Sequence, residues 1–185
     1  MEFLERSAVL TALVDALRTR GSWCGETHVQ KAAYLLQELC RVPLGYEFIL
    51  YKHGPFAFDL RDELDVVQGY GLLATEAAPG GYRPRFATTD GGTRNAERHR
   101  GVVKAHARDV EFVADKLGNK AVAELERLAT ALFITREPSA PADVEGRAER
   151  MHALKPHVSV EQARAAIEEI DRLLAATPDR NTTSR

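Results

Sequence analysis

Apolar residues recur at spacings of three and four along most of the chain, which is the pattern of amphipathic helices. In the first segment, Leu10, Leu13 and Leu17 would form one apolar stripe, and Gly21 would end the helix. Similar stripes follow in six later segments. The predicted helices span Leu4–Arg20, Thr27 to just before Pro43, Pro55–Gln68, Thr93–Leu117, Ala121–Thr135, Ala142–Leu154 and a last segment that starts at Ser159.

Two of these helices begin with a capping-box pattern, in which a Ser or Thr side chain and a Gln side chain satisfy free N–H groups at a helix start. Thr27 and Gln30 form the first pair, and Ser159 and Gln162 form the second. We expect the apolar stripe of the last helix to pack on the chain's own core, with self-association into a homodimer as the alternative. That stripe consists of Val160, Ala163, Ile167, Ile170 and Leu174.

Short strands are predicted where aromatic and branched residues gather. Tyr46–Tyr51 suits one strand, and Leu72–Glu76 and Tyr82–Thr88 suit a β-hairpin whose turn is Pro79-Gly80-Gly81. Helix, helix, strand, helix, hairpin is the order of a winged-helix domain. The sequence therefore predicts a mainly α (α+β) fold, in which a winged-helix-like unit with a small β-hairpin sheet is followed by a helical extension.

We expect this fold to form one compact domain. Residues 1–90 would be the winged-helix-like core, residues 91–176 a helical part packed on it, and residues 177–185 a disordered polar tail. The stretch from Val29 to Gly71 organises the first part. Within it, Gly54 can adopt backbone angles closed to other residues, and Pro55 suits the first turn of a helix. The pair is therefore predicted to open the third helix.

Several pieces of the chain, taken in order, match the pattern of one family. They are Gln30-Lys31, Tyr34-Leu35-Leu36, Pro43-Leu44, Tyr46, Tyr51-Lys52-His53-Gly54-Pro55-Phe56, Leu125-Glu126-Arg127-Leu128-Ala129-Thr130 and Leu154-Lys155-Pro156-His157. Together they resemble the Panacea (SocA-like) family and its stand-alone relatives of the YwgA type. The resemblance implies a mostly helical domain with a small sheet, and an antitoxin or adaptor that works by binding protein partners. It implies no catalytic residues.

Composition adds few constraints. The chain has 185 residues, of which 44% are hydrophobic and 28% charged, as in an ordinary globular domain with a substantial core. The formal net charge of −2 means that binding to nucleic acid or to a membrane surface would need a local patch. No export signal and no apolar run of roughly 18 residues is present, so we expect a cytoplasmic protein that does not enter membranes.

No combination of residues predicts catalysis or a metal site. The six histidines lack the tight spacings of zinc ligands, and His99 with His106 is too sparse a set. Cys24 and His28 are close in sequence, but no oxyanion-forming motif accompanies them. Reduced cysteines are expected, with one Cys24–Cys40 disulfide as the alternative. We therefore expect a non-enzymatic protein without cofactor or metal.

A protein partner is the favoured ligand, either a toxin or a regulated protein. The third predicted helix is acidic, with only Arg61 against its carboxylates, so its outer face would repel phosphate. The aromatic residues before it would be either core or the edge of a binding groove. The candidate partner-binding residues are Tyr51, Lys52, His53, Phe56, Asp59, Asp62 and Glu63.

The alternative is a nucleic-acid-binding, transcriptional regulator. Cations four residues apart would line one face of the predicted helix 93–117, and two arginines lie in the predicted hairpin. The candidate residues are Arg83, Arg85, Arg94, Arg98, Arg100, Lys104 and Arg108. A solvated helix face is the simpler interpretation of this charge. An antiparallel homodimer, pairing the acidic helix with the basic one, is a further hypothesis.

Overall fold

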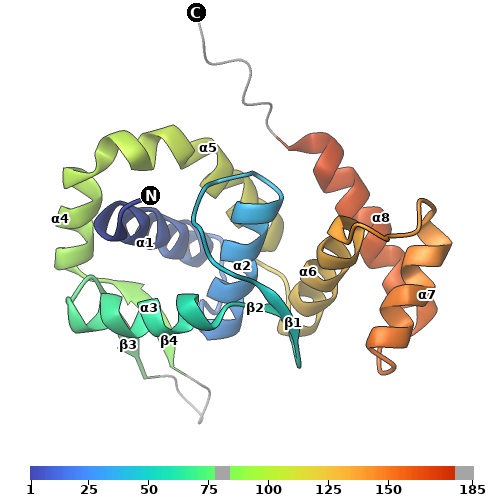
Figure 1. Ribbon diagram of the computed structural model, residues 1–185. Coiled ribbons are helices and arrows are strands. Elements are labelled where there is room, and N and C mark those ends of the chain that lie inside the picture. The colour runs from blue at the N-terminus through green and yellow to red at the C-terminus, as the bar shows by residue number, and fades with distance from the viewer. Residues whose placement is uncertain (78–83, 178–185) are drawn as a thin grey trace, which may run out of the picture.

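The computed structural model describes residues 1–77 and 84–177, which form eight helices and four short strands (Figure 1). The elements are α1 (Phe3–Thr19), α2 (Glu26–Glu38), β1 (Ile49–Tyr51), β2 (Gly54–Phe56), α3 (Phe58–Gly69), β3 (Leu73–Glu76), β4 (Arg85–Thr88), α4 (Asp90–Arg98), α5 (Arg100–Leu117), α6 (Val122–Arg136), α7 (Val144–Leu154) and α8 (Val160–Ala176). The mainly helical class with small antiparallel hairpins, predicted from the sequence, is confirmed.

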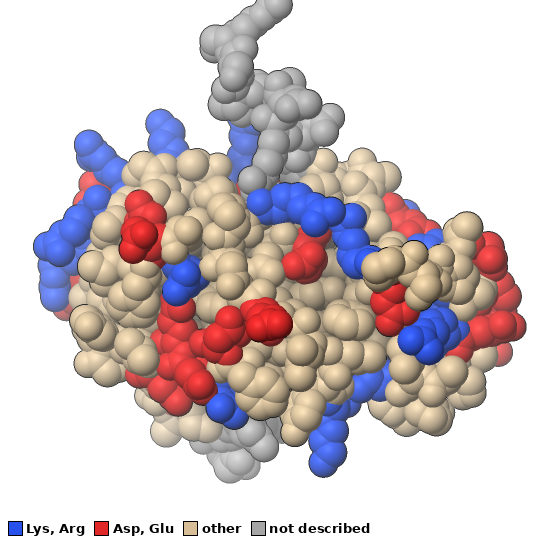
Figure 2. All heavy atoms as spheres, in the orientation of Figure 1, with Lys and Arg blue, Asp and Glu red and all other residues tan. Residues whose placement is uncertain are grey.

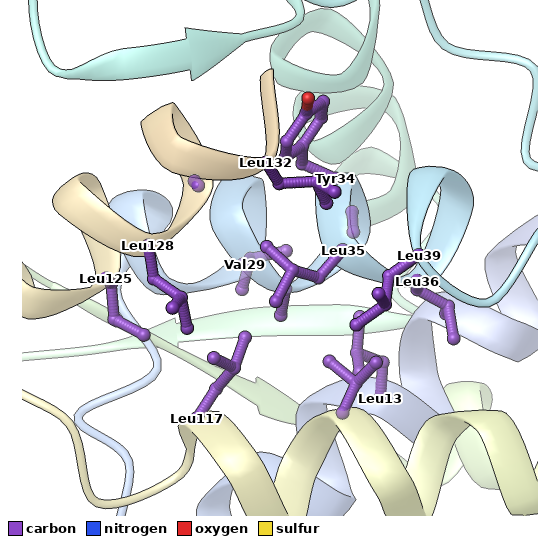
Figure 3. Packing of buried hydrophobic residues seen from close by; sticks show 14 of the residues in the cluster. Leu13, Val29, Tyr34, Leu35, Leu36, Leu39, Leu117, Leu125, Leu128 and Leu132 are labelled. Atoms are coloured by element: carbon purple, nitrogen blue, oxygen red, sulfur yellow. The ribbon is translucent and has the colours of Figure 1, made fainter. Parts of the chain in front are cut away.

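Helix α2 lies at the centre of the molecule. It packs against α1 and α5 on one side and against α6 on the other. Figure 3 shows leucines of α1, α5 and α6 meeting the apolar side chains of α2. Every residue from His28 to Leu36 is buried, so the middle of α2 presents no polar face to solvent. Two polar side chains, Gln30 and Lys31, are therefore enclosed with the leucines.

The Gly54-Pro55 pair closes a hairpin, and the prediction that it opens a helix is wrong. Strand β1 pairs antiparallel with β2, with Tyr51 opposite Gly54. Gly54 does adopt the expected left-handed conformation, with φ of +84°. Pro55, however, is buried in β2, where its carbonyl accepts a hydrogen bond from Lys31. Because Pro55 is extended and pairs with Leu50 of β1, the third helix starts only at Phe58.

One of the two predicted capping boxes forms. Ser159 caps α8 by accepting from the N–H of Gln162, while the Gln162 amide oxygen accepts from the N–H of Ser159. The pair of Thr27 and Gln30 does not form, because α2 already begins at Glu26 and the Gln30 amide binds backbone groups of another element.

The second hairpin, β3–β4, is confirmed, with Leu73 opposite Thr88. Its predicted turn at 79–81 lies outside the described residues. Arg18 of α1 fixes this hairpin by donating to the Phe86 carbonyl at 2.8 Å and by pairing with Glu76. The order of α1, α2, α3 and this hairpin is the one expected for a winged-helix unit, with the β1–β2 hairpin inserted.

The prediction of a single helix over 93–117 is wrong, because the chain leaves the helical conformation at His99. Helix α4 packs on α1 and β4, whereas α5 runs along α1 and α2, and one straight helix could not make both sets of contacts. Beyond α5, the last helix packs on α6 and α7 through its apolar stripe, as predicted. The predicted tail lies outside the described residues from 178 onward.

None of the helices within 1–77 and 84–177 has the length and apolar character needed to cross a membrane.

Substituting Gly54 tests how tightly the first hairpin is docked. A Cβ at this position would lie 2.8 Å from Thr130 Oγ1 and 3.2 Å from the Glu126 carbonyl oxygen, in addition to the positive φ. Gly54→Ala should therefore lower the free energy of unfolding by about 2–4 kcal/mol, measured by denaturant titration. Gly69→Ala, on the open surface at the end of α3, is the matched control. Equal, small effects of the two changes would contradict tight docking.

Candidate functional site

The corner formed by residues 51–57 is fixed from below by two side chains of α2. The Gln30 amide donates to the Ala57 carbonyl at 2.9 Å and accepts from the Ala57 N–H at 3.1 Å. Gln30 thus satisfies both backbone groups of Ala57, as a neighbouring strand would. The next residue, Lys31, donates from Nζ to the Pro55 carbonyl at 2.9 Å. Consecutive residues of one helix therefore set the path of the backbone from Pro55 to Ala57.

Lys31 is unusual because it carries an ammonium group and is nevertheless buried, with only 1% of the residue exposed. Burial lowers the pKa of Lys31 from 10.5 to about 8, with the Glu126 carboxylate acting in the opposite direction and the Lys155 ammonium adding to the decrease. The amine stays predominantly protonated at pH 7, but its titration is close to neutrality. The burial of this charge is offset by its hydrogen bond to Pro55 and by the nearby carboxylate.

The turn between β1 and β2 is fixed from two further directions. Lys155, at the end of α7, donates from Nζ to the carbonyls of Tyr51 and Lys52 at 2.6 and 2.8 Å. On the side of α6, His53 Nδ1 lies 3.3 Å from Glu126 Oε1. Side chains from α2, α6 and the end of α7 therefore converge on one four-residue turn.

Four of the sequence segments singled out above, 30–31, 51–56, 125–130 and 154–157, meet here although they are far apart in the chain. Gln30-Lys31 lies beneath the corner 51–56, the piece 125–130 lies beside it on α6, and the piece 154–157 closes it from α7. Between these pieces lies a cavity of about 170 Å³. It is lined by Lys52, His53, Gly54, Ala123, Glu126, Arg127, Thr130, Met151, Lys155, His157, Val158 and Gln162.

On the outer side of the corner, three aromatic rings meet in tilted and edge-to-face contacts, and we call Tyr51, Phe56 and Phe58 the aromatic corner. The ring centroid of Phe56 lies 6.0 Å from that of Tyr51 and 5.1 Å from that of Phe58, and the centroids of Tyr51 and Phe58 are 5.5 Å apart. Tyr51 is 51% exposed and Phe58 is 39% exposed. The aromatic residues predicted from the sequence therefore fall into two groups: Tyr34 and Tyr46 belong to the core, whereas Tyr51 lies at the surface.

The predicted acidic residues of α3 differ in availability. Asp62 is exposed and forms an ion pair with its neighbour Arg61. The carboxylate of Asp59 accepts from the N–H groups of Glu47 and Leu60. Glu63 turns inward, with 10% of its side chain exposed, and accepts from Arg6 Nε at 2.9 Å. Figure 2 shows the acidic side chains gathered over α3. Glu63 therefore forms a structural ion pair with Arg6 and does not belong to the exposed surface.

The predicted basic residues also differ in how available they are to a ligand. Arg85 lies over the Trp23 ring and donates to Glu76, so its charge is already compensated, and Arg83 lies outside the described residues. The helix cations remain exposed along the outer edge of α4 and α5 (Figure 2). Those residues are Arg94, Arg98, Arg100, Lys104 and Arg108.

Groups considered for catalysis or metal binding do not form a site. Both cysteines are buried thiols, as expected, and burial raises the pKa of Cys24 to about 12, which disfavours a nucleophilic thiolate. Burial also lowers the pKa of His28. His99 lies at the break between α4 and α5, off the regular helix that carries His106. Among the described residues, no three His, Cys, Asp or Glu side chains are placed to bind a metal ion.

Reasoning from the sequence missed the groups that build this site. Lys31, Glu126 and Lys155 were noted only as parts of matching pieces, and Phe58 was not noted as a site residue. The burial of Lys31 could have been expected, because Lys31 lies four residues before Leu35, on the apolar side of its predicted helix. The contacts of Glu126 and Lys155 with the turn could not, because these residues are far from the turn in the chain.

Comparison of this chain with models of known protein families and with curated proteins gives no match.

The lowered pKa of Lys31 predicts a specific pH dependence. The unfolded chain keeps this proton up to about pH 10.5, whereas the folded chain loses it from about pH 8, so folding stability should rise with pH between these values. The free energy of unfolding of the wild type, minus that of Lys31→Met, should increase by about 2 kcal/mol from pH 7 to pH 10. Denaturant titrations at both pH values measure it, with Lys104→Met as the exposed control. A difference that stays constant with pH would contradict the assignment.

Proposed function

We propose that this chain is a non-enzymatic, cytoplasmic regulator of the antitoxin or adaptor type, which binds a protein partner through the aromatic corner. The observation that carries the proposal is that three aromatic rings, in tilted and edge-to-face contact, lie on the outer side of a hairpin that side chains from three other elements hold in place. The family that the sequence resembles includes antitoxins and adaptors, which supports the same class of function.

The physical argument concerns the cost of binding. Exposed aromatic side chains dominate many protein interfaces, since each buries a large apolar area and loses few rotatable bonds. Here the rings already pack on one another, and the backbone beneath them is bonded to Lys31 and Lys155. A partner would therefore not have to order a loop before making contact, which favours affinity.

Charge beside the aromatic corner defines the partner further. Phe58 opens α3, and Asp62 and Asp65 are exposed on the same helix. An apolar side chain flanked by lysine or arginine would fit this surface, since electrostatic complementarity steers association and rejects acidic competitors. We therefore propose a partner segment that carries a basic residue beside an apolar anchor.

A nucleic-acid-binding regulator is the second candidate, on a different surface. The observation in its favour is that the α4–α5 cations stay exposed on one edge of the molecule, with Arg100 and Glu97 as a solvent-exposed pair. The compensated charge of Arg85 weakens the contribution expected from the hairpin. Binding to phosphate would depend steeply on salt concentration.

A quantitative pull-down from a lysate of the source organism tests the first proposal. The bait proteins are the wild type, Tyr51→Ala with Phe58→Ala, and Asp62→Lys with Asp65→Lys. We expect the wild type to retain one or more proteins. The amount of retained protein should be at least tenfold lower with each double variant. Purified partner should then show the same order of affinities by calorimetry, because the changes remove the apolar anchor site and reverse the neighbouring charge.

Two controls make the result specific. Tyr70→Ala removes an exposed aromatic ring at the other end of α3, and Glu168→Lys reverses an exposed charge on α8; both should retain the partner. Equal retention by all variants would refute the proposed surface. Recovery of nucleic acid alone, abolished by Arg100→Ala, Lys104→Ala and Arg108→Ala together, would establish the second candidate instead.

A further inference from the structure

A further pocket lies where two connections between helices run side by side. Residues 20–25 join α1 to α2, and residues 118–121 join α5 to α6. Arg20 forms an ion pair with Asp115 of α5, and a Cβ at Gly118 would overlap the Arg20 side chain. The two connections are therefore held close together. The pocket that they border has a volume of about 580 Å³.

The pocket offers an accessible apolar surface and no free charge. Trp23 is half-buried and Val122 is 41% exposed, and both line the pocket. Among the described residues that line it, Lys120 alone carries a full charge. Its Nζ pairs with Glu169 Oε1 at 2.9 Å, so this charge already has a counter-charge. The lining therefore favours an uncharged, largely apolar ligand.

The Trp23 ring is held in position at the edge of this pocket. The guanidinium carbon of Arg85 lies 5.6 Å from the ring centroid of Trp23, and a Cβ at Gly25 would lie 3.2 Å from Trp23 Cδ1. An indole confined in this way loses little conformational freedom when a ligand packs on it, which favours binding. Another aromatic ring is a suitable ligand group, because rings in contact gain energy beyond the area that they bury.

His28 lines the same pocket and has no hydrogen-bond partner among the described residues. It belongs to the first turn of α2 and is only 6% exposed. Burial lowers the pKa of His28, so the imidazole is neutral at pH 7, with one nitrogen that donates a hydrogen bond and one that accepts. Buried polar groups in folded proteins are nearly always paired. The pocket is the side from which a ligand can pair with this ring.

We propose that this pocket binds a small, neutral aromatic molecule that carries one hydroxyl or N–H group. Its ring packs against Trp23 and Val122, and its hydroxyl or N–H donates to the unprotonated nitrogen of His28. An anion would find no free cation here, and a purely apolar ring would leave the imidazole unpaired. The pocket shares no lining residue with the cavity beside the aromatic corner, so the site does not depend on what the aromatic corner binds.

An NMR titration of the full, ¹⁵N-labelled chain tests the proposal, with phenol, toluene and benzoate as probes. Trp23 is the only tryptophan of the chain, so its indole N–H gives a single signal. We expect phenol to shift this signal and the amide signals of residues 21–28 and 118–122. His28→Leu should weaken phenol binding roughly three- to tenfold, the effect of one hydrogen bond, and should not weaken toluene binding. Benzoate should bind more weakly than phenol.

Matched variants keep the outcome decisive. Val122→Asp should weaken phenol and toluene alike by roughly fivefold or more, because it places a charge in the apolar wall. Val66→Asp, at an exposed position of α3, should leave both unchanged, as should His157→Leu, which removes an exposed histidine outside the pocket.

Thermal unfolding of each variant separates lost binding from lost folding. Three results would each overturn the proposal: an effect of His28→Leu that is the same for phenol and toluene, a Trp23 signal that phenol does not shift, or benzoate binding as tightly as phenol.

Discussion

The enclosure of α2 on all its sides is the constraint on which the rest of the structure depends. A helix packed against α1, α5 and α6 has no solvent for its polar side chains, so the amide of Gln30 and the ammonium of Lys31 need partners inside the protein. The backbone of Pro55 and Ala57 supplies those partners. The position of the first hairpin is therefore a consequence of polar groups buried in a helix, as well as of its own strand pairing.

Once the hairpin is fixed in this way, its two sides acquire different properties. The outer side presents aromatic rings in edge-to-face contact next to an acidic helix, and the inner side borders a cavity between α6 and the α7–α8 junction. Both rely on Gly54, which lets the chain turn within van der Waals distance of Thr130 and Glu126. The short turn from Tyr51 to Gly54 thus connects two different surfaces, although its residues form one continuous motif in the sequence.

The sequence predicted helices well wherever local signals agreed with packing. The apolar stripe of α8 and its Ser159 cap needed only neighbouring residues, and both predictions are confirmed. Predictions were wrong where a distant partner decided the outcome: Gln30 bonds Ala57 instead of its own helix start, and Pro55 stays extended because it pairs with Leu50 of β1. The break at His99 likewise follows from α4 and α5 packing on different neighbours.

The candidate site was predictable only in part, for the same reason. The corner 51–56 was recognised from its residue pattern, but the inward turn of Glu63 depends on Arg6, which is 57 residues away in the chain. Likewise, Lys155 reaches the turn from more than one hundred residues away. Spacing within a helix cannot reveal such partners.

The bonds from α2 also determine how this hairpin can be approached. Pro55 has no N–H, its carbonyl is occupied by Lys31, and both backbone groups of Ala57 are occupied by Gln30. The outer edge of β2 therefore offers no unpaired main-chain groups at these positions to another extended chain. Edge-to-edge sheet extension, which underlies both β-strand addition by ligands and much aggregation, is blocked there by side chains. Recognition at this edge of β2 must therefore proceed through side chains.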